Sequence, residues 1–91
     1  MSESIFKPSR ELTFDTVQSD SQRLLKLLKH RDTSEIHLDL SDVVLCDSAG
    51  LALLIDAKKL CKQHKKELTI KGMTPDISAL AEFCGVKGML V

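Results

Sequence analysis

The stretch that most constrains the fold spans residues 43–55, where an apolar run ends at Cys46 and is followed at once by Asp-Ser-x-Gly at 47–50. Asp47 and Ser48 suit the start of a helix, because a short side-chain oxygen can accept a free backbone N–H there. Gly50 has no Cβ and lets another backbone segment come close. The pattern predicts a strand end, a tight turn and a helix that begins at or beside Ser48, with this hydroxyl at the positive end of the helix dipole.

The predicted helix extends from about residue 48 to residue 66. At about 100° per residue, one side gathers the apolar residues of its second half, which are Leu53, Leu54, Ala57, Leu60 and Cys61. In the first half, Leu51, Ala52 and Ile55 project onto the opposite, lysine-bearing side, in line with Ser48. We therefore expect an apolar patch beside a polar cap. Either the N-terminal segment covers this patch, or it is a docking surface for another protein.

The N-terminal part of the chain predicts two short strands and a helix. Residues 4–7 and 11–14 carry strand-like patterns on either side of a turn at 8–10, where Pro8 fixes φ. We expect these two strands to pair as a hairpin at the edge of a sheet. A helix capped by Asp15 or Thr16 should follow and end near His30.

The remaining elements predict one α/β domain over residues 1–91. Residues 35–40 and 67–71 alternate between polar and apolar side chains, as half-buried strands do. A last helix begins after Thr74, with Pro75 at its first position, and residues 86–91 are expected to be a loop or a brief edge strand. The order β-β-α-β-α-β-α predicts a small mixed sheet with helices packed largely on one face.

Composition excludes several classes of function. The 91 residues carry 13 basic and 13 acidic side chains, so no basic excess indicates a nucleic-acid partner. No apolar run is long enough to cross a bilayer, and the N-terminus lacks the pattern of a signal peptide. We therefore expect a cytoplasmic protein without direct membrane insertion, whose connection to a membrane, if any, is made by a partner.

No arrangement of residues indicates catalysis, a metal site or a cofactor. Ser48 has no evident base, the three histidines are expected at the surface, and no phosphate-cradling loop or dinucleotide fingerprint is present. The odd number of widely spaced cysteines indicates neither zinc nor a disulfide framework, so Cys46, Cys61 and Cys84 are expected to be buried thiols. These observations predict a binding module and not an enzyme.

Several segments together resemble the STAS domain family. They are Leu-Asp-Leu-Ser at 38–41, Val-Val at 43–44, Asp-Ser-Ala-Gly-Leu-Ala at 47–52 and the strand that ends at Gly72. The resemblance covers nearly the whole chain in length and in element order. It implies the STAS-like fold, in agreement with the order of elements given above.

Within this family, the segment Gly-Leu-Ala-Leu-Leu at 50–54 is most similar to MlaB, the STAS subunit of phospholipid (Mla-type) ABC transporters. The resemblance implies a non-catalytic cytoplasmic subunit that supports the transporter ATPase (MlaF-like), and through it the permease (MlaE-like), in maintaining outer-membrane lipid asymmetry. Ser48, Ala49, Leu51, Ala52 and Ile55 would form the partner interface, with Asp47 and Gly50 as cap and motif support.

The same family contains anti-sigma factor antagonists, which leave a second hypothesis open. In antagonists, a kinase phosphorylates the hydroxyl residue after the motif aspartate, which is Ser48 here. MlaB-like proteins usually have Thr at this position, so Ser48 keeps the phosphorylation hypothesis open, whereas Ala49 replaces a second hydroxyl common in antagonists. The N-terminal segment also departs from the family pattern, because it lacks a glycine-containing strand end.

Overall fold

The computed structural model describes residues 2–30 and 32–90. The expected α/β order is confirmed, with two short elements added, β4 and α4. The elements are β1 (Ser2–Phe6), β2 (Glu11–Leu12), α1 (Val17–Leu28), β3 (Thr33–Asp39), β4 (Leu45–Cys46), α2 (Ser48–Gln63), β5 (Glu67–Lys71), α3 (Pro75–Phe83) and α4 (Lys87–Leu90). Residues 86–91 were expected to form a loop or a brief edge strand, but most of them form the short helix α4. Val91, which completed that expected strand, lies outside the described residues.

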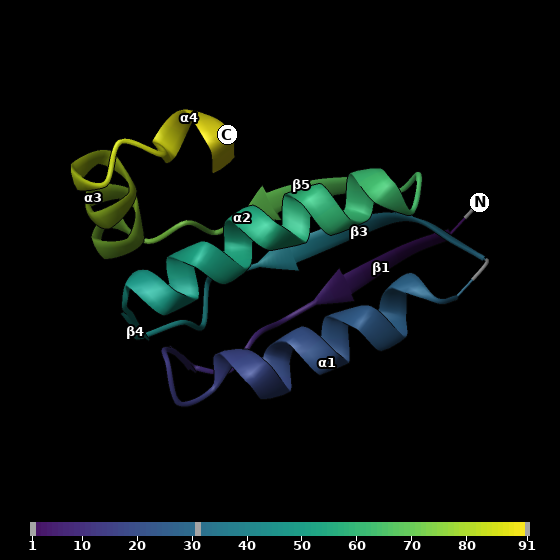
Figure 1. Cartoon of the computed structure of the whole chain (residues 1–91), viewed down its shortest axis with the longest axis horizontal. Coiled ribbons are helices and arrows are strands. Elements are labelled where there is room, and N and C mark those ends of the chain that lie inside the picture. Colours follow the sequence, from purple (N-terminus) through teal and green to yellow (C-terminus); the bar gives the residue numbers. More distant parts are fainter. Residues whose placement is uncertain (1, 31, 91) are drawn as a thin grey trace.

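All described strand pairs are parallel, so the sheet is not mixed. The main sheet has the order β1-β3-β5 (Figure 1). β2 pairs with β4 in a separate two-stranded ladder. The expected hairpin between residues 4–7 and 11–14 is wrong, because β1 pairs with β3 and β2 pairs with β4. The sequence of two short adjacent strands does not indicate that each pairs with a distant strand. The distant strands are brought beside them only by the crossover helices.

The connection between β1 and β2 is held on α1. Asp20 is fully buried, and its carboxylate accepts hydrogen bonds from the Ser9 backbone N–H at 3.1 Å and from the Ser9 hydroxyl at 2.9 Å. Arg23 pairs with this carboxylate at 2.9 Å and donates a second hydrogen bond to the Lys7 carbonyl oxygen at 2.8 Å. Residues 7–9 therefore lie along the helix and do not close a hairpin.

The main sheet has one covered face and one open face. In β3 the expected alternation is confirmed: Ile36 and Leu38 are buried beneath the helices, whereas His37 and Asp39 lie on the other side. Figure 1 shows α1 and α2 lying side by side along the sheet. The core between them is built from the buried residues of both layers, chiefly Leu12, Leu24, Ile36, Leu38, Leu40, Leu54, Ala57 and Ile77.

The three cysteines differ in burial. Cys61 is buried on α2 as expected, and Cys46 is half-buried at the end of β4. Cys84 is exposed, so the expectation that it is a buried thiol is wrong. The reason is that α3 ends at Phe83 and Cys84 is already its C-cap. Burial raises the pKa of the Cys46 thiol to about 11, which leaves it protonated and unreactive at neutral pH.

Gly50 permits the contact that places β2 across the start of α2. A Cβ on this residue would overlap the Leu12 carbonyl group, lying 2.9 Å from its carbon, and would come within 3.0 Å of the Cys46 sulfur. The obstructing atoms of Leu12 are backbone and cannot rotate away. The close approach expected from the Asp-Ser-x-Gly motif is therefore present, and the segment that approaches is β2.

Gly50→Ala should destabilise the protein by roughly 1–3 kcal/mol, the usual cost of overpacking a closed contact. Thermal and urea unfolding would measure the loss. Gly88→Ala in α4 is the matched control, because nothing lies within 4 Å of the Cβ it would add. Equal stabilities for the two variants would show that β2 does not rest on α2 as described.

Candidate functional site

Asp47 joins the start of α2 to the segment that follows β2. One carboxylate oxygen accepts a hydrogen bond from the Gly50 backbone N–H at 3.0 Å, which is the expected N-cap. The other oxygen accepts from the Phe14 backbone N–H at 3.1 Å. The Asp47 backbone N–H in turn donates to the Leu12 carbonyl oxygen at 3.3 Å. One residue therefore fixes both the helix start and the loop beside it.

These hydrogen bonds lower the pKa of Asp47 below the ordinary 3.8. The main causes are the backbone N–H groups of Gly50 and, next, Phe14, since both stabilise the charged carboxylate. Asp47 is thus ionised throughout the physiological range. It places a permanent negative charge next to Ser48.

Ser48 is the first residue of α2, and its side chain is exposed. Its hydroxyl forms no hydrogen bond with the part of the chain that the structure describes, so it is free to meet a partner or to be modified. Ala49 is half-buried and Ala52 is exposed on the next turn. The structure thus presents a hydroxyl, with small apolar side chains around it, at the rim of the domain.

The expected exposure of Leu51 is wrong. Its side chain is only 3% exposed, and that of Ile55 is half-buried against the core. A helical projection assigns one buried face to α2, but β2 crosses the start of this helix and covers a second side. Leu51 therefore supports the surface from below and cannot contact a partner directly.

Three large apolar side chains that the sequence did not single out lie exposed at this end of the domain. Phe14 is 79% exposed, Val44 is 62% exposed and Leu45 is 53% exposed. They are brought there by the β2–β4 pair, in which Glu11 lies opposite Leu45, and by the Phe14–Asp47 hydrogen bond. We define the Ser48 surface by its exposed or half-buried members, namely Phe14, Val44, Leu45, Ser48, Ala49 and Ala52.

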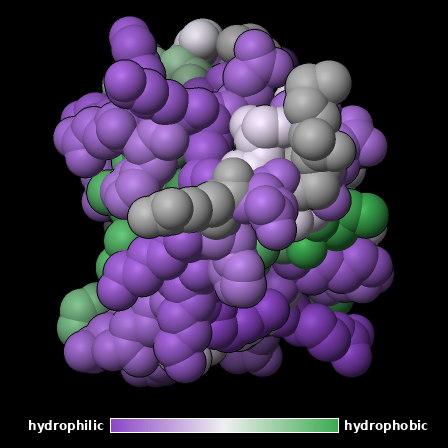
Figure 2. Space-filling model, turned by 90° about the vertical axis from the view of Figure 1, so that its right-hand side faces the viewer, coloured by the Kyte–Doolittle hydropathy of each residue, from purple (hydrophilic) through white to green (hydrophobic). Residues whose placement is uncertain are grey.

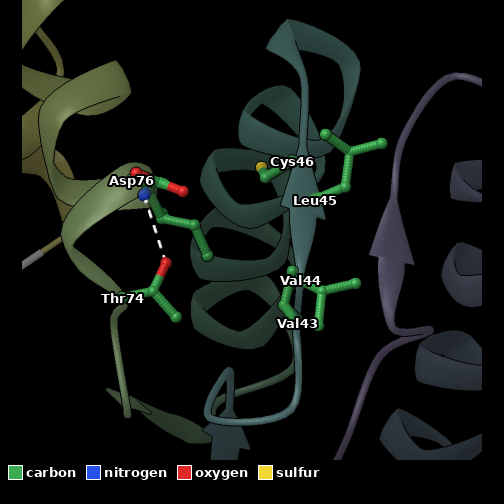
Figure 3. A pocket seen from close by; sticks show the side chains of 7 residues that line it. Val43, Val44, Leu45, Cys46, Thr74 and Asp76 are labelled. Atoms are coloured by element: carbon green, nitrogen blue, oxygen red, sulfur yellow. Dashed lines mark hydrogen bonds between the residues drawn. The ribbon is translucent and has the colours of Figure 1, made fainter.

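Two hollows flank the Ser48 surface. One, of about 450 Å³, lies between residues 43–46 and the start of α3, where Thr74 and Asp76 face the strand (Figure 3). The other is a groove between α1 and α2, and its lining includes Val17, Ala49 and Ala52. In contrast, the end of the molecule near the C-terminus of α2 is mostly hydrophilic (Figure 2). Large apolar side chains are also exposed in other elements, at Ile5 in β1, Phe83 in α3 and Met89 in α4.

One group of side chains within residues 2–30 and 32–90 has the spacing of metal ligands. Glu3, Glu35 and His37 each offer one ligand atom, and these atoms lie within 4.8 Å of one another on the open face of the sheet. His37 and Glu3 already interact at 3.2 Å, and this hydrogen bond, together with the imidazole charge, lowers the pKa of Glu3. His30 and His64 are exposed as expected, whereas the His37 side chain is only 16% exposed.

No helix in the described parts of the chain combines the length and the apolar character needed to cross a bilayer.

Comparison with known proteins gives a consistent picture of the family. Residues 9–91 match the family model described as "Mlab, STAS domain". The anti-sigma-B factor antagonist of Staphylococcus aureus (strain NCTC 8325) is 32% identical over 84 residues, which cover 92% of this chain and 77% of the antagonist. The antagonist of Staphylococcus epidermidis is 30% identical over 84 residues, which again cover 92% of this chain and 77% of the antagonist. A sulfate transporter family protein from Wolinella succinogenes shares the fold, with a TM-score of 0.76, 18% identity and coverage of 98% of this chain and 71% of that one.

Asp47→Asn should lower the thermal unfolding temperature at pH 7, because the helix start and Phe14 would lose a charged acceptor. An aspartate with a lowered native pKa stabilises the fold above its unfolded pKa, and this contribution is lost as the pH falls through the native value. The difference between wild type and variant should therefore shrink as the pH falls below 3.8. Unfolding curves at several pH values would test this, with Asp56→Asn, on an exposed face of α2, as the control. A difference that does not change with pH would contradict the role given to the carboxylate.

Proposed function

Because the chain belongs to the STAS domain family, in the branch described as MlaB, we propose that it is a non-catalytic subunit that binds the ATPase of a phospholipid ABC transporter. Contact is made through the Ser48 surface. The permease is reached through the ATPase, so the domain lies at the cytoplasmic side of the inner membrane without entering it. Its role is to support the assembly or activity of the ATPase.

The observation that carries this proposal is the grouping of exposed apolar side chains around a fixed helix start. Phe14, Val44 and Leu45 are each more than half exposed, Ala52 is exposed on α2, and the Ser48 hydroxyl at the start of this helix has no partner in the described chain. Apolar side chains grouped in this way on a small domain are typical of a protein-binding surface. An aromatic side chain at such a place is a frequent source of binding energy.

The position of Ser48 also favours a rigid docking site over a flexible one. Asp47 holds the helix start through Gly50 and holds the neighbouring loop through Phe14. A partner that binds here meets side chains that are already in place, so little ordering entropy is lost on association. The buried Leu51 adds to this rigidity, and for that reason its replacement would test folding and not binding.

Ser48→Asp should abolish or strongly reduce capture of the ATPase and permease when the tagged protein is purified from its own cells in mild detergent. A carboxylate at the start of α2 is compatible with the helix dipole, so the variant should fold. It would place an unpaired charge in an apolar contact, which is costly. Gln63→Glu is the matched control, because it adds one negative charge at the far end of the same helix on an exposed residue.

Two results would contradict the proposal. Recovery of no transporter component with the wild type would remove the proposed partner. Equal recovery of the ATPase with wild type and Ser48→Asp would leave the partner but exclude the Ser48 surface as the contact.

A second candidate function is favoured by the curated relatives, which are anti-sigma-B factor antagonists. In this case a kinase partner would bind the same surface and phosphorylate Ser48. The phosphate would find the Gly50 N–H at the helix start already occupied by Asp47 and would lie beside this ionised carboxylate. The added charge would therefore disrupt an apolar contact more than it would stabilise the helix.

The second candidate predicts that the captured partner is a small kinase and that Ser48 becomes phosphorylated in its presence. Mass spectrometry of the protein after incubation with this kinase and ATP would detect the modification, and Ser48→Ala would be the control. An unmodified Ser48 would exclude the antagonist function. A transporter ATPase as the captured protein would also count against it.

A further inference from the structure

The outer edge of β5 has no strand partner among residues 2–30 and 32–90. β5 is the last strand in the order β1-β3-β5 and pairs only with β3. Its side chains alternate between exposed and half-buried, with Glu67, Thr69 and Lys71 exposed. A free parallel edge presents unpaired backbone groups to solvent and can accept another strand.

The orientation of the β5 backbone follows from one hydrogen bond. The Lys71 carbonyl oxygen accepts from the Leu40 N–H at 2.9 Å, so the backbone of Lys71 is directed toward the β3 side. Successive residues of a strand direct their backbone groups to alternate sides, so Leu68 and Ile70 direct theirs outward. These two residues therefore supply the unpaired N–H and C=O groups of the free edge.

We propose that the outer edge of β5 pairs with β5 of a second copy of this chain, in antiparallel orientation about a two-fold axis at Thr69. In this register Leu68 lies opposite Ile70 of the second copy, and the reverse pair forms by symmetry. Each pair exchanges two N–H···O=C hydrogen bonds, because the outward backbone groups belong to these residues. The six-stranded sheet that results is continuous across the axis.

The side chains of β5 are complementary to themselves in this register. Glu67 of one copy lies directly opposite Lys71 of the other, so each end of the ladder carries an opposite-charge pair. The two Thr69 residues lie opposite each other at the axis and form a non-hydrogen-bonded pair. Side chains come closer together in such pairs than in hydrogen-bonded ones. On the helix-bearing face, Leu68 meets Ile70. A self-complementary patch is what a two-fold dimer requires.

The charges along the sheet favour a second copy over an unrelated strand. Glu67 lies in register with Glu35, and Glu35 lies in register with Glu3, so three carboxylates follow one another across the three strands. Like charges in register are unfavourable. In the dimer, Lys71 of the second copy places a positive charge at the end of this row.

The proposed pair is small and leaves the Ser48 surface free. A ladder of five residues buries less than the roughly 1,200 Å² typical of a stable interface, so we expect a weak dimer in the micromolar to millimolar range. Ser48 begins α2, whereas β5 follows the end of this helix. This inference therefore does not rest on the function proposed above, and each can fail without the other.

The pairing can be tested by exchanging the charges at the two ends of β5. Analytical ultracentrifugation across a concentration series would measure the dimer dissociation constant of each variant. Glu67→Lys alone and Lys71→Glu alone should each raise the dimer dissociation constant at least about tenfold, because attraction becomes repulsion at both ends of the ladder. The double variant should dimerise as the wild type does. An equimolar mixture of the two single variants should form a heterodimer, since each then meets its opposite charge.

Lys59→Glu is the matched control, because it exchanges one exposed charge on α2 away from the edge. It should leave the dissociation constant unchanged. Thermal unfolding of all variants would establish that the monomers are folded. A wild type that remains monomeric up to about 1 mM would overturn the proposal, as would single variants that dimerise as well as the wild type.

Cysteine cross-linking would establish the register. In a Cys84→Ser background, Thr69→Cys should form an intermolecular disulfide under mild oxidation, because opposite side chains at the axis come close enough to be bridged. Thr69 is exposed, so the change should not disturb the core. Lys59→Cys in the same background is the control and should not cross-link. A dimer that cross-links equally at both positions would contradict the β5 pairing.

Discussion

The fold depends on the junction at which Asp47 and Gly50 bring the start of α2 against the backbone of residues 12–14. β2 and β4 contain only two residues each, and strands of this length are not stable by themselves. They are held in place because Asp47 binds the N–H of Phe14 and because Gly50 allows the Leu12 carbonyl group to come close. The helix cap is thus also a contact that joins residues 12–14 to the start of α2.

Local chemistry made this junction partly predictable from the sequence. The motif Asp-Ser-x-Gly at 47–50 follows an apolar run and predicts a helix cap and a close backbone approach, and both are present. The alternation of polar and apolar side chains in residues 35–40 and 67–71 likewise predicted the strands β3 and β5. Which segment approaches Gly50 could not be read from these patterns, because the answer lies in Leu12, more than thirty residues earlier in the chain.

The errors about the hairpin and about Leu51 share one physical cause, which is strand pairing between segments that are distant in sequence. Adjacent strands with a proline turn favour a hairpin, but the buried Asp20, paired with the half-exposed Arg23, holds the connecting segment on α1. A helical projection placed Leu51 at the surface because it could not include the strand that crosses the helix. For the same reason Phe14 and Leu45 were missed, since their exposure follows from the β2–β4 pair and not from their own neighbours in sequence.

The described helices cover only one face of the main sheet. Parallel sheets are usually covered on both faces, whereas in β3 the side of Ile36 and Leu38 is buried and the side of His37 and Asp39 is only partly buried. The uncovered face accordingly carries polar side chains such as Glu35 and His37, which tolerate water. Apolar side chains such as Phe14 and Leu45 are nevertheless exposed at the other end of the domain, and the function proposed above would use them as a contact for another protein. The one-sided construction of the domain therefore leaves one sheet face open to solvent, and Ser48 lies apart from that face, at the start of α2.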